Sequence, residues 1–322
     1  MILRLTRSTF WRRSGRVLAL LACGLAARAE RLYEVTGRLT PETPGAVTLH
    51  HVQSPFATDT LADAGGRFRF RRIPAGAYTL SAFSPSAGEG RMTIDVGAGT
   101  ADSKGRLAVT LRLTESRHTI EKSSRVSARE LSIPSKAWKE YLAAQKKLAR
   151  NDVDGAIADL ERAVGIAPRF AVAWNNLGTI AYQTRRYPDA EEKFRRALEA
   201  DPQAYEPLVN LGGVLINLGK IDEAWKYNVY AVLTRDRDAL AHSQLGQTYF
   251  LQNKLDLAEK HLLESCRLDA AHFSHPQLFL AEIYLRRGDR LKAAVQLDEF
   301  LKHHPDWPAA TRMKSKIEEW RR

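Results

Sequence analysis

The residues best suited to bind a ligand are carboxamides that recur along the second half of the chain. Asn176, Asn210 and Gln244 follow one another at intervals of 34 residues. A carboxamide both donates and accepts hydrogen bonds, so it can pair with the N–H and C=O groups of a peptide main chain without requiring a particular side chain. Lysine and arginine are nearly absent from the positions that we expect to face the same surface. The predicted peptide-binding residues are Asn175, Asn176, Thr179, Gln183, Asn210, Asn217, Gln244 and Gln247.

A second set of polar residues is basic and lies near the N-terminus. Arg67, Arg69 and Arg71 alternate with Phe68 and Phe70, so the arginines share one face of an expected strand and the phenylalanines the other. Such a face could receive an acidic polysaccharide, and it is also the ordinary pattern of a solvated outer face. The three arginines are therefore the candidate residues for carbohydrate binding, which we keep as an alternative.

The sequence contains no motif that predicts catalysis. It lacks a glycine-rich phosphate loop, a G-x-S-x-G turn, an H-E-x-x-H helix and paired cysteines. His50 and His51 are adjacent in an expected strand, so they point to opposite faces and cannot ligate one metal together. His272 and His275 fall in a turn beside Pro276, where we interpret them as loop residues. We expect no catalytic residue, no metal site and no cofactor.

The elements that carry the carboxamides are helices. Residues 171–202 read as two amphipathic helices, because apolar and small residues recur every three or four positions and a turn before Pro188 separates the two runs. Gly178 removes bulk where the helices approach closely, while Trp174 and Leu177 fill the space between them. One such hairpin cannot bury its own apolar face. Copies of it must therefore stack.

The copies are present at a period of about 34 residues. Small residues hold two places in register through five copies; these are Ala144, Gly178, Gly212, Gly246 and Ala281, and Ala156, Ala190, Ala224, Ala258 and Ala293. The W-x-x-L-G signature is at Trp174, Leu177 and Gly178, A-x-x-x-F is at Ala190 and Phe194, and the closing proline is at Pro168, Pro202 and Pro305. Over residues 135–306 the sequence resembles the tetratricopeptide repeat family.

This resemblance implies an all-α solenoid over residues 135–322. Its five helical hairpins lie near residues 137–170, 171–204, 205–238, 239–272 and 274–307, and residues 308–322 form a capping helix with Ile317 and Trp320 on the last hairpin. Asparagine on the concave surface of this family can bind a peptide main chain, and Asn176, Asn210 and Gln244 occupy one equivalent place. The basic clamp by which some members hold a C-terminal carboxylate is not matched.

Residues 30–115 show a different period. Alternating apolar residues predict six short strands, near residues 33–39, 46–52, 67–73, 77–82, 91–96 and 107–113, which indicate a small all-β sandwich. The pattern D-x-x-G-x-F-x-F at residues 63–70, followed by I-P-x-G-x-Y-x-L at residues 73–80, resembles the carboxypeptidase regulatory-like domain, which has a transthyretin-like and carbohydrate-binding-like fold. We expect a hairpin turn at Pro74 and Gly76. Residues 116–134 read as a linker.

The first residues predict a signal peptide over residues 1–29. Residues 1–16 contain five arginines and no acid, residues 17–26 are apolar, and Ala27-Arg28-Ala29 is typical of a signal-peptidase site. The mature chain would begin at Glu30 and be exported, either to a periplasm or out of the cell. A lipid anchor at Cys23 and a retained membrane anchor are the alternatives. No later stretch is apolar enough to span a membrane.

Charge and cysteine content narrow the partners further. The net charge is +12, and six of these charges are arginines of the expected signal, so the mature chain has too small an excess to indicate nucleic acid. Cys266 is the one cysteine left after the signal and reads as a small buried hydrophobe. We predict an exported, non-enzymatic, multidomain interaction protein that binds a protein or peptide segment. A carbohydrate-binding module with the array as scaffold, and an accessory subunit of an envelope enzyme or export complex, remain alternatives.

Overall fold

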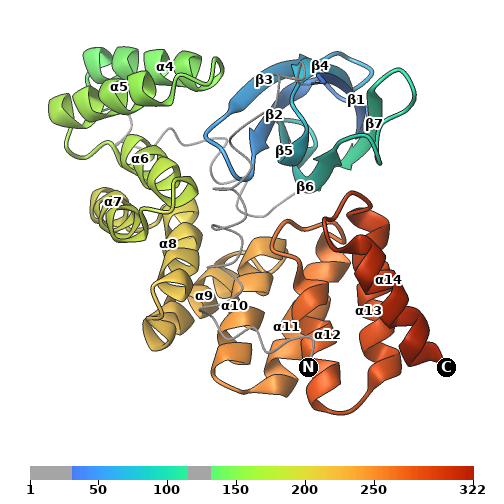
Figure 1. Cartoon of the computed structure of the whole chain (residues 1–322). Coiled ribbons are helices and arrows are strands. Elements are labelled where there is room, and N and C mark those ends of the chain that lie inside the picture. The colour runs from blue at the N-terminus through green and yellow to red at the C-terminus, as the bar shows by residue number, and fades with distance from the viewer. Residues whose placement is uncertain (1–30, 115–131) are drawn as a thin grey trace, which may run out of the picture.

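The computed structural model describes residues 31–114 and 132–322. Within these ranges a domain of seven strands is followed by eleven helices, and the helices curve around the strands (Figure 1). The expected signal and most of the expected linker lie outside the described residues. Among the residues that are described, no helix is both long enough and apolar enough to cross a membrane.

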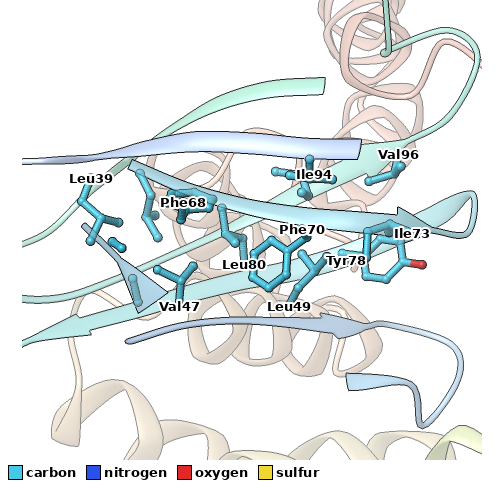
Figure 2. Packing of buried hydrophobic residues seen from close by; sticks show 14 of the residues in the cluster. Leu39, Val47, Leu49, Phe68, Phe70, Ile73, Tyr78, Leu80, Ile94 and Val96 are labelled. Atoms are coloured by element: carbon cyan, nitrogen blue, oxygen red, sulfur yellow. The ribbon is translucent and has the colours of Figure 1, made fainter. Parts of the chain in front are cut away.

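The strands form two sheets that pack face to face. Their bounds are β1 Tyr33–Thr40, β2 Gly45–His51, β3 Ala57–Ala62, β4 Arg67–Ile73, β5 Gly76–Ser84, β6 Gly88–Val96 and β7 Arg106–Arg112. One sheet has the order β4-β1-β7, with β1 and β7 parallel, and the other has the order β3-β2-β5-β6. Alternate residues point inward because side chains alternate across a strand. Figure 2 shows Phe68 and Phe70 packed among Leu49, Leu80 and Tyr78 in this core.

Two details of the sandwich differ from the sequence-based expectation. Strand β3 was not predicted, because only Ala62 at its end is buried and the strand has no apolar alternation. The turn at Pro74 and Gly76 is not a hairpin: β4 and β5 belong to different sheets, so the turn carries the chain across the sandwich. Tyr78, after the turn, nevertheless packs in the same core as Phe68, before it.

The helical half consists of stacked hairpins. Its helices are α4 Ser135–Leu148, α5 Val153–Ile166, α6 Ala171–Gln183, α7 Tyr187–Ala200, α8 Tyr205–Asn217, α9 Ile221–Thr234, α10 Ala239–Leu251, α11 Leu255–Leu268, α12 Pro276–Arg286, α13 Arg290–His303 and α14 Ala310–Arg321. Each of the five hairpins pairs an even-numbered helix with the next one, and α14 covers the last pair. Ala144, Ala190 and Ala224 are fully buried at the positions where the sequence requires small residues. A Cβ atom on Gly178 would lie 2.6 Å from Cε1 of Phe194, so only glycine permits this packing.

The sandwich rests against the inner side of the curved array (Figure 1). Its β2–β3 turn approaches α6, where Gln183 donates to the carbonyl of His51 at 3.1 Å. At the other end of the array, the backbone N–H of Thr93 in β6 donates to Asp269 at 2.8 Å. The two domains are thus joined at two separate places on the array, at the second hairpin and at the turn after the fourth.

A cavity between the sandwich and the helical array

A cavity of about 590 Å³ lies between the two domains. The array contributes residues of α4, α6, α8 and α10, which are the first helices of four successive hairpins, and the sandwich contributes His50, Thr79, Arg91 and the β2–β3 turn. This volume is within the range of pockets that enclose small ligands, and pockets of this kind often form at domain interfaces. The concave surface predicted from the sequence is therefore one wall of a cavity whose other wall is the sandwich.

Six of the eight predicted peptide-binding residues line the cavity. They are Asn175, Asn176, Thr179, Gln183, Asn210 and Gln244. Asn217 and Gln247 do not line it; Asn217 donates to the Gly213 carbonyl at 3.0 Å, and Gln247 donates to Ser243 Oγ at 3.1 Å. Residue type and repeat register therefore predicted most of the residues in this wall. They did not show which of the eight predicted residues fail to line the cavity.

Hydrogen bonds between helices fix the carboxamides that face the cavity. Asn210 of α8 donates to Asn175 Oδ1 of α6 at 3.1 Å, and Asn176 approaches the Tyr141 hydroxyl of α4 at 3.5 Å. Each amide still has further donor or acceptor positions after these single bonds. The Thr179 hydroxyl, in contrast, donates to the Asn175 carbonyl of its own helix at 3.0 Å. The wall is thus a row of oriented amides that retain capacity for a ligand.

Gln244 is more deeply placed than its register position suggested. Only 8% of its surface is exposed, although the sequence indicated an outward position. The side chain packs over α8, where a Cβ atom on Gly213 would lie 2.6 Å from its Nε2. Its Oε1 has no hydrogen-bond partner among the described residues. The absence of a side chain at Gly213 leaves room for the Gln244 amide against α8.

Charged groups in the wall are close to opposite charges. Arg91 of β6 lies 4.0 Å from Asp238, and Glu206 of α8 lies 3.4 Å from Arg235. The Arg235 guanidinium also lies over the Tyr205 ring, 4.0 Å from its centroid. These pairs offset the formal charge of Arg91 and Glu206, so these two residues do not form a single-sign charged patch in the wall. Such a wall suits amide groups better than a carboxylate or an ammonium.

The interpretation of His272 as a loop residue was incomplete, and a second histidine near the sandwich is buried as well. His272 is buried in the turn before α12, and burial lowers its pKa to about 3. His304 follows the end of α13 and is also buried, because its Nδ1 lies 3.5 Å from Asp95 of the sandwich. Among the described residues, no group of three or more histidine, cysteine, aspartate or glutamate side chains is arranged to hold a metal.

The basic residues of the alternative site lie elsewhere. Arg67, Arg69 and Arg71 are exposed on β4, in the sheet that does not line the cavity. Arg69 lies 3.6 Å from Glu34 of the neighbouring strand. Sequence reasoning missed the residues that the sandwich gives to the cavity, such as Phe56 and Arg91, because nothing in their local pattern indicates that a second domain faces them.

Comparison with known proteins places the array in a repeat class. A family model described as a tetratricopeptide repeat matches residues 141–205, and another of the same description matches residues 239–272. A BBSome complex member BBS4 homolog from Drosophila melanogaster is 26% identical over 98 residues, which are 30% of this chain and 20% of that protein. The chain therefore spans about a fifth of the length of this relative.

Solved structures are similar to the array at low identity. YrrB, described as a TPR protein with an unusual peptide-binding site, is 23% identical; the match covers 59% of this chain and 100% of that chain with a TM-score of 0.47. PilW, described as a widely conserved type IV pilus biogenesis factor, is 22% identical over 57% of this chain and 90% of that chain, with a TM-score of 0.49. Because the segments matched by the family models coincide with the stacked hairpins, the helical half of this chain is a tetratricopeptide repeat solenoid.

Proposed function

We propose that this protein is an exported, non-enzymatic interaction protein that binds a protein or peptide segment through the carboxamides of the cavity wall. One observation carries the proposal: Gln183 Nε2 donates to the backbone carbonyl of His51 at 3.1 Å and approaches that of Val52 at 3.5 Å. A carboxamide at a predicted binding position thus already holds a peptide main chain. Asn175, Asn176 and Asn210 present the same chemistry along the remaining wall.

Two further parts of the proposal concern the whole chain. The charge and hydropathy of residues 1–29 support export, to a periplasm or out of the cell, with lipid attachment at Cys23 as the alternative. The two motifs at residues 63–80 support a carboxypeptidase regulatory-like identity for the sandwich. On this basis the arginines of β4 remain a second candidate surface, for an acidic polysaccharide, and an envelope complex remains a candidate setting for the whole protein.

The experiment compares a cavity variant with a matched control. Immobilised short uncharged peptides are screened with a protein that begins at Glu30, and the best binder is titrated against Asn175→Ala, Asn176→Ala and Asn210→Ala. Each loss should cost roughly 0.5–1.5 kcal/mol of binding, or about 2- to 13-fold in Kd. The Gln247→Ala variant removes a carboxamide of α10 that does not line the cavity, and it should bind as the parent does.

The salt dependence of binding distinguishes the cavity wall from the arginines of β4 as the binding site. Binding to neutral carboxamides should change little between low and high ionic strength, whereas binding to Arg67, Arg69 and Arg71 should weaken because salt screens exposed charges. The triple arginine-to-alanine variant of β4 provides this comparison. Unchanged affinity in all three carboxamide variants, with a normal helical circular dichroism signal, would exclude the cavity wall as the binding site.

A further inference from the structure

The tip of the β2–β3 hairpin, residues 51–56, has a shape that its own histidine fixes. His51 Nδ1 accepts the backbone N–H groups of Gln53 at 3.0 Å and Ser54 at 2.9 Å, and the His51 N–H donates to the Phe56 carbonyl at 2.9 Å. The imidazole packs edge-on against Tyr78, with ring centroids 4.8 Å apart. Residues of the tip and of β5 thus make the hydrogen bonds and the ring contact that shape this turn.

The array holds this tip as it would hold a ligand. The carbonyls of His51 and Val52 are directed at Gln183 at the end of α6, and Pro55 and Phe56 line the same cavity as Asn175 and the other wall residues. Within the tip only Gln53 is well exposed, and the remaining residues are half-buried. One end of the predicted binding surface is thus occupied by another part of the same chain.

A separate set of contacts holds the sandwich at the far end of the array. Asp269 accepts the Thr93 N–H at 2.8 Å, and Asp306 accepts the Gly99 N–H at 2.9 Å. These two latch aspartates lie in turns between α11 and α12 and between α13 and α14. Thr93 belongs to β6, an edge strand of its sheet, whose outward N–H groups need a partner. Asp269 thus satisfies a strand edge from the neighbouring domain.

We propose that the sandwich is the resident occupant of the array's concave surface, and that a long protein segment gains that surface only by displacing it. This inference rests on the proposed function, because it assigns the tip and the external segment to the same carboxamide wall. The cavity of about 590 Å³ has room for a short ligand beside the tip. A segment extended over α4 to α10 must instead compete with the tip at Gln183. The latch aspartates contribute to the free energy that is needed to displace the sandwich from the array.

The test uses one locked and one unlatched form of the full chain. A Cβ atom on Gly99 would lie 2.9 Å from Asp306 Cγ, so Gly99→Cys with Asp306→Cys places two Cβ atoms within reach of a disulfide. Oxidation then locks the sandwich in place. Burial raises the pKa of the native Cys266 to about 12, so this thiol should not take part in thiol–disulfide exchange with the engineered pair. Asp269→Ala with Asp306→Ala is the unlatched form, and Asp256→Ala, at an exposed acid of α11, is its control.

Hydrogen exchange at the tip is measured first, since it needs no ligand. The amides of Gln53 and Ser54 should exchange about tenfold faster in the unlatched form than in the control, and no faster in the locked form than in the parent. These amides are remote in sequence from the substituted residues, so a change in their exchange rate reports release of the tip from the array. Equal exchange in the locked and unlatched forms overturns the inference, whatever any external peptide does.

The second measurement uses a fluorescent peptide that copies residues 49–57. It should bind the unlatched form about tenfold more tightly than the oxidised locked form, and reduction of the lock should restore binding. Equal binding to both forms, or binding to neither, overturns the inference, because the tip would then not share the surface. Failure of the proposed function has a different signature: Asn175→Ala, Asn176→Ala and Asn210→Ala would leave the affinity of the peptides selected by screening unchanged, while tip exchange still responds to the latch.

Discussion

At the scale of single residues, Gly178 shows how closely the helices of one hairpin approach. The Phe194 ring, which is 1% exposed, fills the space beside it, so the Gly178→Ala methyl group would displace the ring. We expect this change to lower the free energy of unfolding by roughly 1–3 kcal/mol, because overpacking strains a core. Urea denaturation followed by circular dichroism measures it.

Gly165 of α5 is the matched control for that substitution. No atom lies within 4 Å of a Cβ placed on it, so Gly165→Ala should raise the free energy of unfolding by about 0.5–1 kcal/mol through helix propensity alone. Equal effects of the two alanine substitutions would mean that Gly178 is not at a close helix contact.

His272 should make the stability of the protein depend on pH. It is 4% exposed, its Nδ1 lies 2.6 Å from Ser274 Oγ, and burial lowers its pKa to about 3, while Arg91 lowers it further and Asp238 opposes the shift. The unfolded chain binds this proton near pH 6.5 and the folded chain does not. Stability is therefore complete above about pH 7 and falls as the pH drops, by on the order of 3 kcal/mol at pH 4.

The substitution His272→Gln isolates this contribution. Denaturation midpoints of the variant should fall less steeply between pH 7 and pH 4 than those of the parent. His275, whose pKa burial lowers to about 4, leaves part of the slope in place. Burial raises the pKa of Asp269, which acts in the opposite direction and favours the folded form as the pH falls. A parent and a variant with identical slopes would show that His272 titrates normally in the folded protein.

At the scale of elements, α14 protects the open end of the array. Ile317 is 2% exposed and packs in the same cluster as Phe300 and Leu301 of α13. We expect Ile317→Ala to cost about 2–5 kcal/mol, because it removes buried methyl groups and leaves a cavity. Thermal unfolding compares it with Lys314→Ala on the exposed face of the same helix, which should change stability by less than about 0.5 kcal/mol. A loss no larger than that of the control would mean that α14 is not part of the core.

The sequence predicted helices better than strands, and the reason is physical. Small residues at two fixed places determine where helices approach, so the buried positions of Ala156, Ala190 and Ala258 could be predicted from the sequence. Strand β3 has no comparable pattern, because it buries only its last residue. The turn at Pro74 was misassigned, since a hairpin and a crossover between sheets use the same residue types.

At the scale of the whole molecule, the position of the sandwich could not be predicted. Two of the contacts that hold it use backbone N–H groups, which every sequence offers, and the aspartates Asp269 and Asp306, which are ordinary turn residues. The same limit applies to the cavity wall. Repeat register identified Asn176 and Asn210, but nothing local showed that a second domain would close over them.

The N-terminal segment gives a prediction about the exported molecule. If residues 1–29 are the signal that we propose, the protein recovered from the native envelope should begin at Glu30 and carry no lipid. Edman sequencing and intact mass measure both properties. Recovery of a chain that begins with an acylated Cys23 would instead show that the protein is tethered to a membrane.

The parallel pairing of β1 with β7 has a mechanical consequence. The two strands are paired over seven consecutive positions, from Glu34 opposite Arg106 to Thr40 opposite Arg112. Tension applied through the chain at Arg31 and Thr114 pulls the strands in opposite directions along their length. All the hydrogen bonds of the ladder then share the load in shear, whereas a hairpin pulled from its open end breaks them one at a time. The sandwich should therefore resist stretching, so that a force on the N-terminus reaches the repeats before the sandwich unravels.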